Sequence, residues 1–553
     1  MLSSCPAWEM PVIVSSEAAA DVEGGQVGLD DQVALQELRS SRLLREYGPP
    51  AMLALIVGAL AVVMYSTHRA GHWWGDDWAL YIRQAKGLLD GNPNRVLVEN
   101  EFTVNASDGP EFSPPLYPWG FPLLLAPFIA VVGVNIDKLT IVPVLCACVF
   151  ACCWYSLARR RVGLAPALIG VAAVTITPLL LSWTELIQSE WPFLALVGIA
   201  LVCLDRVADT GALADPRGGL APLILVGLAG AAAFTVRREG LAMVGAIAAA
   251  QLAAIIAQRA YPWLLNLRGL GRLAARLALP HATFLAAVGL LQVTLPSTVV
   301  PKYDGTSVTN VWTLRGRLVR NLAQVSGLQR PWDRDPMVLG SSRAGWVALT
   351  LFLVLAVIGI ELALVRYRTR DLHLAAYALG AFMIGGSFRS PINRYVCSVA
   401  PVLMVLALVA LYTIVGRLTR PWVGTLTLSL ALGAIFAGNV ANAHLRMESA
   451  ARSRDQGAIE WGPTHPDAIA MFDAVEQLTG PDDIVAAPKA RAMGLETGRP
   501  SIQVDDWRPI PPDVEISLIV AERTSNVANA LLNAPDQFTP VWENPRFMVF
   551  RPV

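Results

Sequence analysis

The stretch AGWVALTLFLVLAVIGIELALVRYRTR, residues 344–370, shows the pattern that decides the fold. Its first 22 residues carry one charge, Glu361, and its last five include three arginines. A helix of that length rises about 33 Å, enough to cross the hydrocarbon core of a bilayer. Basic residues collect on the cytoplasmic side of such helices. The stretch therefore predicts a transmembrane helix that ends in the cytoplasm.

Apolar runs of this kind recur along most of the chain. Of the 553 residues, 54% are hydrophobic and 16% are charged, whereas soluble domains carry about 25% charge. Lysine plus arginine and aspartate plus glutamate both number 43, so the composition gives no sign of a nucleic-acid partner. Most cysteines lie inside apolar runs, which argues against a disulfide framework. We predict a polytopic α-helical membrane protein with about eleven or more spans, and the other ten runs are 50–65, 139–157, 162–181, 191–204, 219–235, 240–257, 280–296, 371–387, 395–415 and 421–440.

The basic clusters orient these spans. Arg39, Arg42 and Arg45 precede the first run and place the N-terminus in the cytoplasm. All later clusters fall on the same side if the apolar run 119–134 is a juxtamembrane or re-entrant helix. The competing interpretation, a crossing at 119–134, inverts all of them. The proline-rich entry at 114–118 favours the first interpretation.

Four regions follow from this topology. They are a cytoplasmic tail (1–48), a transmembrane module (49–297) with a first outer loop (66–138), an outer loop with a variable transmembrane module (298–440), and an extracytoplasmic domain (441–553). The last region has soluble composition. A helical pattern at Asp467–Leu478 and short strand-like runs, among them Ile484–Ala487, predict that it is a small α/β domain.

The first candidate site is the pair Asp76-Asp77, which opens an amphipathic helix that runs to Leu89. A carboxylate that is partly desolvated beside the membrane has a raised pKa, which suits the removal of a proton from a hydroxyl. The alternative is a helix cap, a common role for aspartate at this position.

Three further stretches place charges at the same predicted face. Glu185 and Glu190 lie in a short outer turn. Arg237-Arg238-Glu239-Gly240 joins two apolar runs, and arginine binds phosphate through two parallel hydrogen bonds; the alternative is an arginine–glutamate pair that closes on itself. The outer loop 297–343 is also basic, either as a phosphate site or as an amphipathic helix at 311–323 on lipid head groups. Its cations are Lys302, Arg315, Arg317, Arg320, Arg330, Arg334 and Arg343, and Arg394 follows on the same side.

Taken in order, these motifs resemble the GT-C superfamily of membrane glycosyltransferases that use polyprenyl-phosphate sugars. Within it the chain is similar to bacterial lipid A aminoarabinose transferases, protein O-mannosyltransferases and their actinobacterial relatives. The motifs that carry the resemblance are Asp76-Asp77 with Tyr81, Pro114–Pro118, Glu190–Phe193, Arg237–Gly240 and Arg394-Tyr395.

The resemblance implies a GT-C fold at the plasma (inner) membrane and an inverting transferase. The donor is a polyprenyl-phosphate pentose or hexose, and the acceptor is a hydroxyl of a cell-envelope glycan, lipid or protein. It makes Asp76 the base, with Asp77 as second choice, and Glu190 the group that orients the acceptor. Some relatives use a divalent metal, but no residue here fixes one. The expected substrate contacts are Tyr81, Glu185, Arg237, Arg238, Lys302, Tyr303 and Arg394.

The proline stretch lacks the lysine found in protein O-mannosyltransferases, which favours a glycan or lipid acceptor over a protein. Two other functions stay open from the residues alone. A transporter or flippase of lipid-linked sugars places its charges near the midplane of the membrane. A non-catalytic envelope scaffold would use region 441–553 to bind a partner.

Overall fold

The computed structural model describes residues 29–107, 114–210, 212–213, 219–257, 267–297, 322, 325, 343–365, 371–386, 393–456, 462–504 and 514–553. The chain forms two compact units, residues 1–55 and 56–553. The described part of the first is the N-terminal portion of helix α1 (Leu29–Ser66). The second unit contains all of the other described elements.

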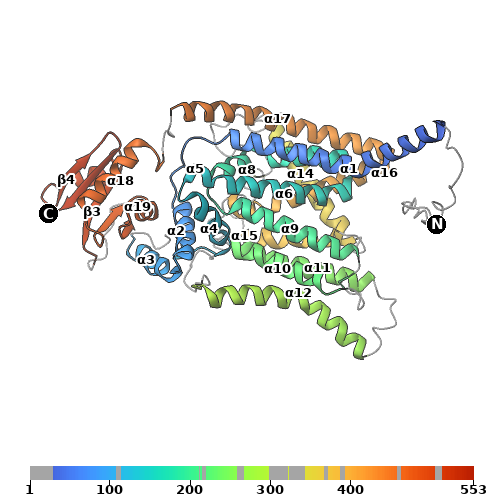
Figure 1. Cartoon of the computed structure of the whole chain (residues 1–553), viewed down its shortest axis with the longest axis horizontal. Coiled ribbons are helices and arrows are strands. Elements are labelled where there is room, and N and C mark those ends of the chain that lie inside the picture. The colour runs from blue at the N-terminus through green and yellow to red at the C-terminus, as the bar shows by residue number, and fades with distance from the viewer. Residues whose placement is uncertain are drawn as a thin grey trace. The chain divides into compact units, whose positions relative to one another are not determined.

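Apolar helices form a bundle that confirms the predicted fold class (Figure 1). Each of the eleven runs contains a helix, although α7 and α8 share one run and are bent by 54° at their junction. Among the described residues eight helices are long and apolar enough to cross a membrane, or nine if the bent pair is one span. The shorter α10 and α15 have 16 and 15 residues, so the count of eleven stays a prediction. Besides α1 the bundle helices are α6 (Ile141–Val162), α7 (Leu164–Thr175), α8 (Pro178–Ser182), α9 (Glu190–Asp209), α10 (Ala221–Val236), α11 (Ala242–Ala257), α12 (Leu267–Thr294), α14 (Arg343–Val365), α15 (Leu372–Gly386), α16 (Val399–Leu418) and α17 (Pro421–Asp455).

The described part of the predicted first outer loop forms four short helices: α2 (Asp77–Leu89), α3 (Pro93–Ala106), α4 (Gly120–Val132) and α5 (Ile136–Leu139). α4 occupies the ambiguous apolar run, and its 13 residues rise only about 20 Å, less than the hydrocarbon thickness. It packs against both α2 and α10. Gly120 permits the second contact, because a Cβ there would lie 2.7 Å from the backbone of Thr235.

The C-terminal region contains a five-stranded sheet in the order β2-β1-β3-β5-β4. β1 runs parallel to β2 and β3, whereas β5 runs antiparallel to β3 and β4. Alternate residues of β3 pack into two hydrophobic clusters on the opposite faces of the sheet. The sheet confirms the predicted α/β character of the C-terminal region. Its elements are α18 (Pro466–Leu478), β1 (Ile484–Ala487), α19 (Ala490–Thr497), β2 (Ser501–Gln503), β3 (Ile516–Glu522), α20 (Asn526–Leu532), β4 (Phe538–Glu543) and β5 (Phe547–Pro552).

Ion pairs draw the helix termini together at both ends of the bundle. At one end Arg161 of α6 donates to Asp205 of α9 and to Asp371 before α15, both at 2.6 Å. The other end carries α2 and α4, which lie between the bundle and the C-terminal domain (Figure 1). α19 packs directly on α2, so this end brings the first outer loop, the helix termini and the C-terminal domain together.

Candidate active site

Asp77 is the first residue of α2, and both of its carboxylate oxygens are hydrogen-bonded. The Tyr117 hydroxyl donates to Oδ1 at 2.5 Å, and Arg394 Nη1 donates to Oδ2 at 2.6 Å. Burial by itself would raise the pKa of Asp77, but the charge of Arg394 and the two hydrogen bonds bring that pKa below its ordinary value. Asp77 is therefore a carboxylate at neutral pH and can accept a proton.

Glu190, the first residue of α9, joins Arg394 to a second arginine. Its Oε1 accepts from Arg394 Nε and, at 2.9 Å, from Arg237 Nη1. Its side chain is fully buried. Glu190 Oε2 is buried as well and accepts no hydrogen bond from the described residues. One carboxylate oxygen thus holds two guanidinium groups while the other is left for a further donor.

Arg237 lies in an extended connection between α10 and the 3₁₀ turn η3 (Arg238–Leu241). It donates to Glu239 Oε1 at 2.9 Å, and its guanidinium lies 5.6 Å from the centre of the Tyr395 ring. Gly240 is required by packing, because a Cβ there would lie 2.5 Å from the backbone nitrogen of Phe234. The motif Arg237–Gly240 therefore forms a tight, buried corner.

These groups form one charged cluster, which we define as Asp77, Glu190, Arg237, Glu239 and Arg394. They come from four separate segments of the chain. Three carboxylates against two guanidinium groups leave the cluster with a net charge of −1. Ionisable groups at a membrane boundary are costly to bury and are usually functional. The predicted convergence of acids and arginines is present, with Asp77 as its first-loop member.

Asp76 forms none of the ion pairs of the cluster, and its two buried carboxylate oxygens have no hydrogen-bond partner among the described residues. The charges that act on its carboxylate are those of Arg491 and Lys489, at the beginning of α19. Burial is the largest effect and raises the pKa of Asp76 to about 6. Two adjacent residues at a helix start thus face different partners, one the bundle and the other the C-terminal domain.

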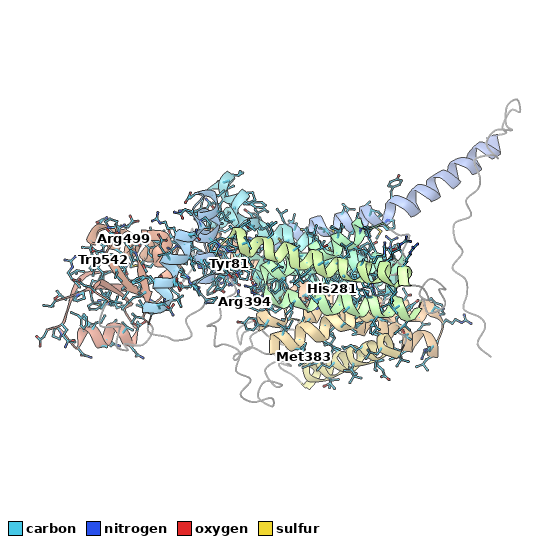
Figure 2. The ribbon with its side chains drawn as sticks, turned by 90° about the horizontal axis from the view of Figure 1, so that it is seen from below. Tyr81, His281, Met383, Arg394, Arg499 and Trp542 are labelled. Carbon is cyan, nitrogen blue, oxygen red and sulfur yellow. The ribbon has the colours of Figure 1, made fainter. Side chains whose placement is uncertain are left out.

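The remaining predicted substrate contacts divide into three groups. Tyr81 is buried, interacts with Ser189, and lies beside Arg394 (Figure 2). Glu185 instead approaches Arg69 at 3.9 Å, and the Arg238 guanidinium lies 5.0 Å from the Phe234 ring. Lys302 and Tyr303 lie outside the described residues.

Sequence reasoning named Arg394 but not Tyr117, the second hydrogen-bond partner of Asp77. Tyr117 stands in the quoted proline stretch. The ion pair between Arg237 and Glu239 is the closed pair that the sequence offered as the alternative for the arginine motif, although Arg237 also bonds Glu190. Arg491, whose guanidinium lies 5.4 Å from the centre of the Tyr117 ring, carried no signal, because nothing in the sequence places α19 on the first outer loop. No three histidine, cysteine, aspartate or glutamate side chains converge as metal ligands in the described ranges.

Comparison with known proteins agrees with this fold. Residues 113–290 match the family model of dolichyl-phosphate-mannose-protein mannosyltransferases. ArnT from Cupriavidus metallidurans bound to undecaprenyl phosphate is 14% identical over 90% of this chain and 98% of its own, with a TM-score of 0.53. The apo state of the same ArnT is 15% identical over 91% of this chain and 98% of its own, with a TM-score of 0.53.

The apo oligosaccharyltransferase of Archaeoglobus fulgidus is 12% identical over 87% of this chain and 70% of its own, with a TM-score of 0.48. No curated protein matches the sequence. The two ArnT structures establish the likeness of fold. The chain therefore has the fold of the ArnT structures, and residues 113–290 match the mannosyltransferase family model.

Proposed function

We propose that this protein is an inverting glycosyltransferase that moves a pentose or hexose from polyprenyl phosphate to a hydroxyl of a cell-envelope glycan, lipid or protein. The observation that carries the proposal is the charged cluster at one end of a GT-C bundle. A carboxylate and two guanidinium groups lie together there, which are the groups that such a displacement requires. ArnT, which shares the fold, was solved with undecaprenyl phosphate.

We assign the general base to Asp77 instead of Asp76, because geometry precedes pKa in choosing a base. Asp77 borders the arginines, whereas Asp76 faces α19. Asp77 takes the proton of the acceptor hydroxyl, and the acceptor oxygen attacks the anomeric carbon. The bond from that carbon to the phosphate oxygen breaks, and polyprenyl phosphate leaves with the electron pair. A single displacement inverts the anomeric centre. Base catalysis of this kind contributes about 10²–10⁴-fold.

The leaving phosphate needs positive charge, and the cluster by itself carries a net charge of −1. We infer that the basic segment after Pro296 supplies the difference. The Pro296 carbonyl accepts a hydrogen bond from Trp119 Nε1 at 2.8 Å. Trp119 follows Tyr117, the partner of Asp77, by two residues, so the basic segment begins at a residue bonded close to the cluster. Lys302 and Tyr303 follow within seven residues. In this scheme Glu190 holds Arg237 and Arg394 in place and orients the acceptor.

The proposal places the cluster and the C-terminal domain on the extracytoplasmic side and the N-terminus in the cytoplasm. The opposite end of the bundle carries Arg159, Arg160 and Arg161, as the positive-inside rule expects for a cytoplasmic face. The protein itself is a multi-pass membrane protein.

A transfer assay tests the assignment. Purified protein in detergent receives a panel of undecaprenyl-phosphate monosaccharides with radioactive sugars, together with envelope extracts as acceptors, and transfer is followed as movement of label out of the donor lipid. Asp77→Asn should lower the rate by about 10²–10⁴-fold while donor binding persists. Asp371→Asn is the matched control, because it also removes the charge of a carboxylate bonded to arginine at 2.6 Å but at the other end of the bundle.

Wild-type transfer by Asp77→Asn would overturn the base assignment. If no donor is turned over but labelled donor crosses sealed vesicles that contain the protein, the chain is a transporter and not a transferase.

A further inference from the structure

The C-terminal domain inserts one arginine into the first outer loop. Arg491, in the first turn of α19, is fully buried. Its Nε donates to Asn100 Oδ1 at 3.0 Å, its Nη2 to the Pro114 carbonyl at 2.7 Å, and its Nη1 to the Tyr117 hydroxyl at 3.3 Å. A single guanidinium therefore ties α3 and both ends of the proline stretch to the domain.

Two hydrogen bonds lead from Arg491 to the proposed base. The Tyr117 hydroxyl accepts from Arg491 and donates to Asp77 Oδ1 at 2.5 Å. The same arginine fixes the backbone at Pro114, and Asn100 Nδ2 holds the next carbonyl, that of Pro115, at 2.5 Å. Tyr117 is thus held in two ways: by the hydrogen bonds of its hydroxyl, and by those that fix the preceding backbone at Pro114 and Pro115.

We propose that Arg491 is a positioning residue of the transfer site, by which the C-terminal domain holds Tyr117 on Asp77 and so keeps the base oriented. The inference rests on the proposed function. It gives the C-terminal domain a part in the chemistry in place of a purely structural one.

The charge of Arg491 has a definite direction of effect. Asp77 is faced by Arg394 and Arg491, by the hydroxyls of Tyr117 and Tyr81, and, across Arg394, by Glu190. The positive charge of Arg491 helps to lower the pKa of Asp77. Without that charge and with a loosened Tyr117 hydrogen bond, the pKa of the base rises. A base must be deprotonated to act, so the acid limb of the pH–rate profile then moves to higher pH.

The experiment is a double-mutant cycle between Arg491 and Tyr117, read as kcat/KM against pH in the transfer assay with undecaprenyl-phosphate sugars. Arg491→Gln and Tyr117→Phe should each lower kcat by about tenfold and move the acid limb upward, because each breaks a hydrogen-bonded network. Arg491→Lys keeps the charge and should leave the limb near its wild-type position. In the Tyr117→Phe background, Arg491→Gln should lower kcat by less than about a further threefold, because the effects of two coupled residues do not add.

Arg499→Gln is the matched control. Arg499 also lies in the C-terminal domain, apart from Arg394 (Figure 2), and donates to the carbonyls of Thr497 and Thr479 at 3.1 and 3.2 Å. It makes no hydrogen bond to the described part of the first outer loop, and its replacement should leave the pH profile unchanged. Loss of domain packing alone would lower the rate without moving the limb.

An unmoved acid limb in Arg491→Gln, or an equal cost of that change with and without Tyr117, overturns the positioning role. If Arg491→Gln does not fold, Tyr117→Phe by itself must move the limb. Asp77→Asn separates the two claims. An inactive Asp77→Asn with a normal Arg491→Gln defeats only the positioning role, whereas an active Asp77→Asn defeats the proposed base.

Discussion

Glu190→Gln tests the charged cluster most directly, because Glu190 Oε1 holds both arginines. Leaving one partner of a buried ion pair uncompensated costs about 3–5 kcal/mol. Glutamine keeps an acceptor oxygen, and each of its two hydrogen bonds recovers about 1 kcal/mol. The net loss is about 1–3 kcal/mol, and if it falls on the transition state, kcat/KM drops by about 5- to 160-fold.

The assay is the radioactive transfer reaction, with kcat and KM for the donor measured separately. Glu99→Gln is the control, because Glu99 also accepts from two arginines, Arg83 and Arg95, both at 2.6 Å. It belongs to α3, outside the cluster, and is 36% exposed, so its replacement should change kcat/KM by less than about twofold. If Glu190→Gln keeps its kcat/KM, or if Glu99→Gln loses as much, the cluster is a structural brace.

Asp76, Gly240 and Arg394 give three more predictions. Burial raises the pKa of Asp76 to about 6 from 3.8, so the stability from its protonated form is full below pH 3.8 and lost as the pH rises through 6; Asp76→Asn should flatten the fall in Tm between pH 4 and 7. Gly240→Ala places a Cβ 2.5 Å from the Phe234 nitrogen and should lower Tm in detergent, since overpacking costs about 1–3 kcal/mol. Arg394→Lys loses the planar fork, so one ammonium must replace bonds to Asp77 and Glu190, and kcat/KM should fall about ten- to a hundredfold; an unchanged value would contradict that role.

The bundle was predictable because hydrophobic length is a local property. A run such as 344–365 must be a helix in a bilayer, since unpaired backbone groups are too costly there. Short strand-like runs such as Ile484–Ala487 likewise predicted the C-terminal sheet region. The order of the strands and the place of α4 depend on contacts between distant segments, and no local pattern encodes them.

The site was predictable by residue type and only partly by partner. Asp76, Asp77, Glu190, Arg237 and Arg394 all belong to motifs that the sequence marks, because acids and arginines between apolar runs cannot be explained by packing. The choice between Asp76 and Asp77 was not local. Adjacent side chains at a helix start diverge, and the element that each one meets decides its role.

The sequence by itself determined a membrane-spanning helical bundle, the segments that carry charge at its boundary and the superfamily they resemble, because helix length and charge position are set within each segment. The tertiary structure alone decided that Asp77 joins the arginines, that Asp76 meets α19, and that Arg491 reaches Tyr117 across almost 375 residues of chain. Those contacts arise from how separate helices and the C-terminal domain pack, and side-chain hydrogen bonds form only between the groups that packing brings within about 3 Å.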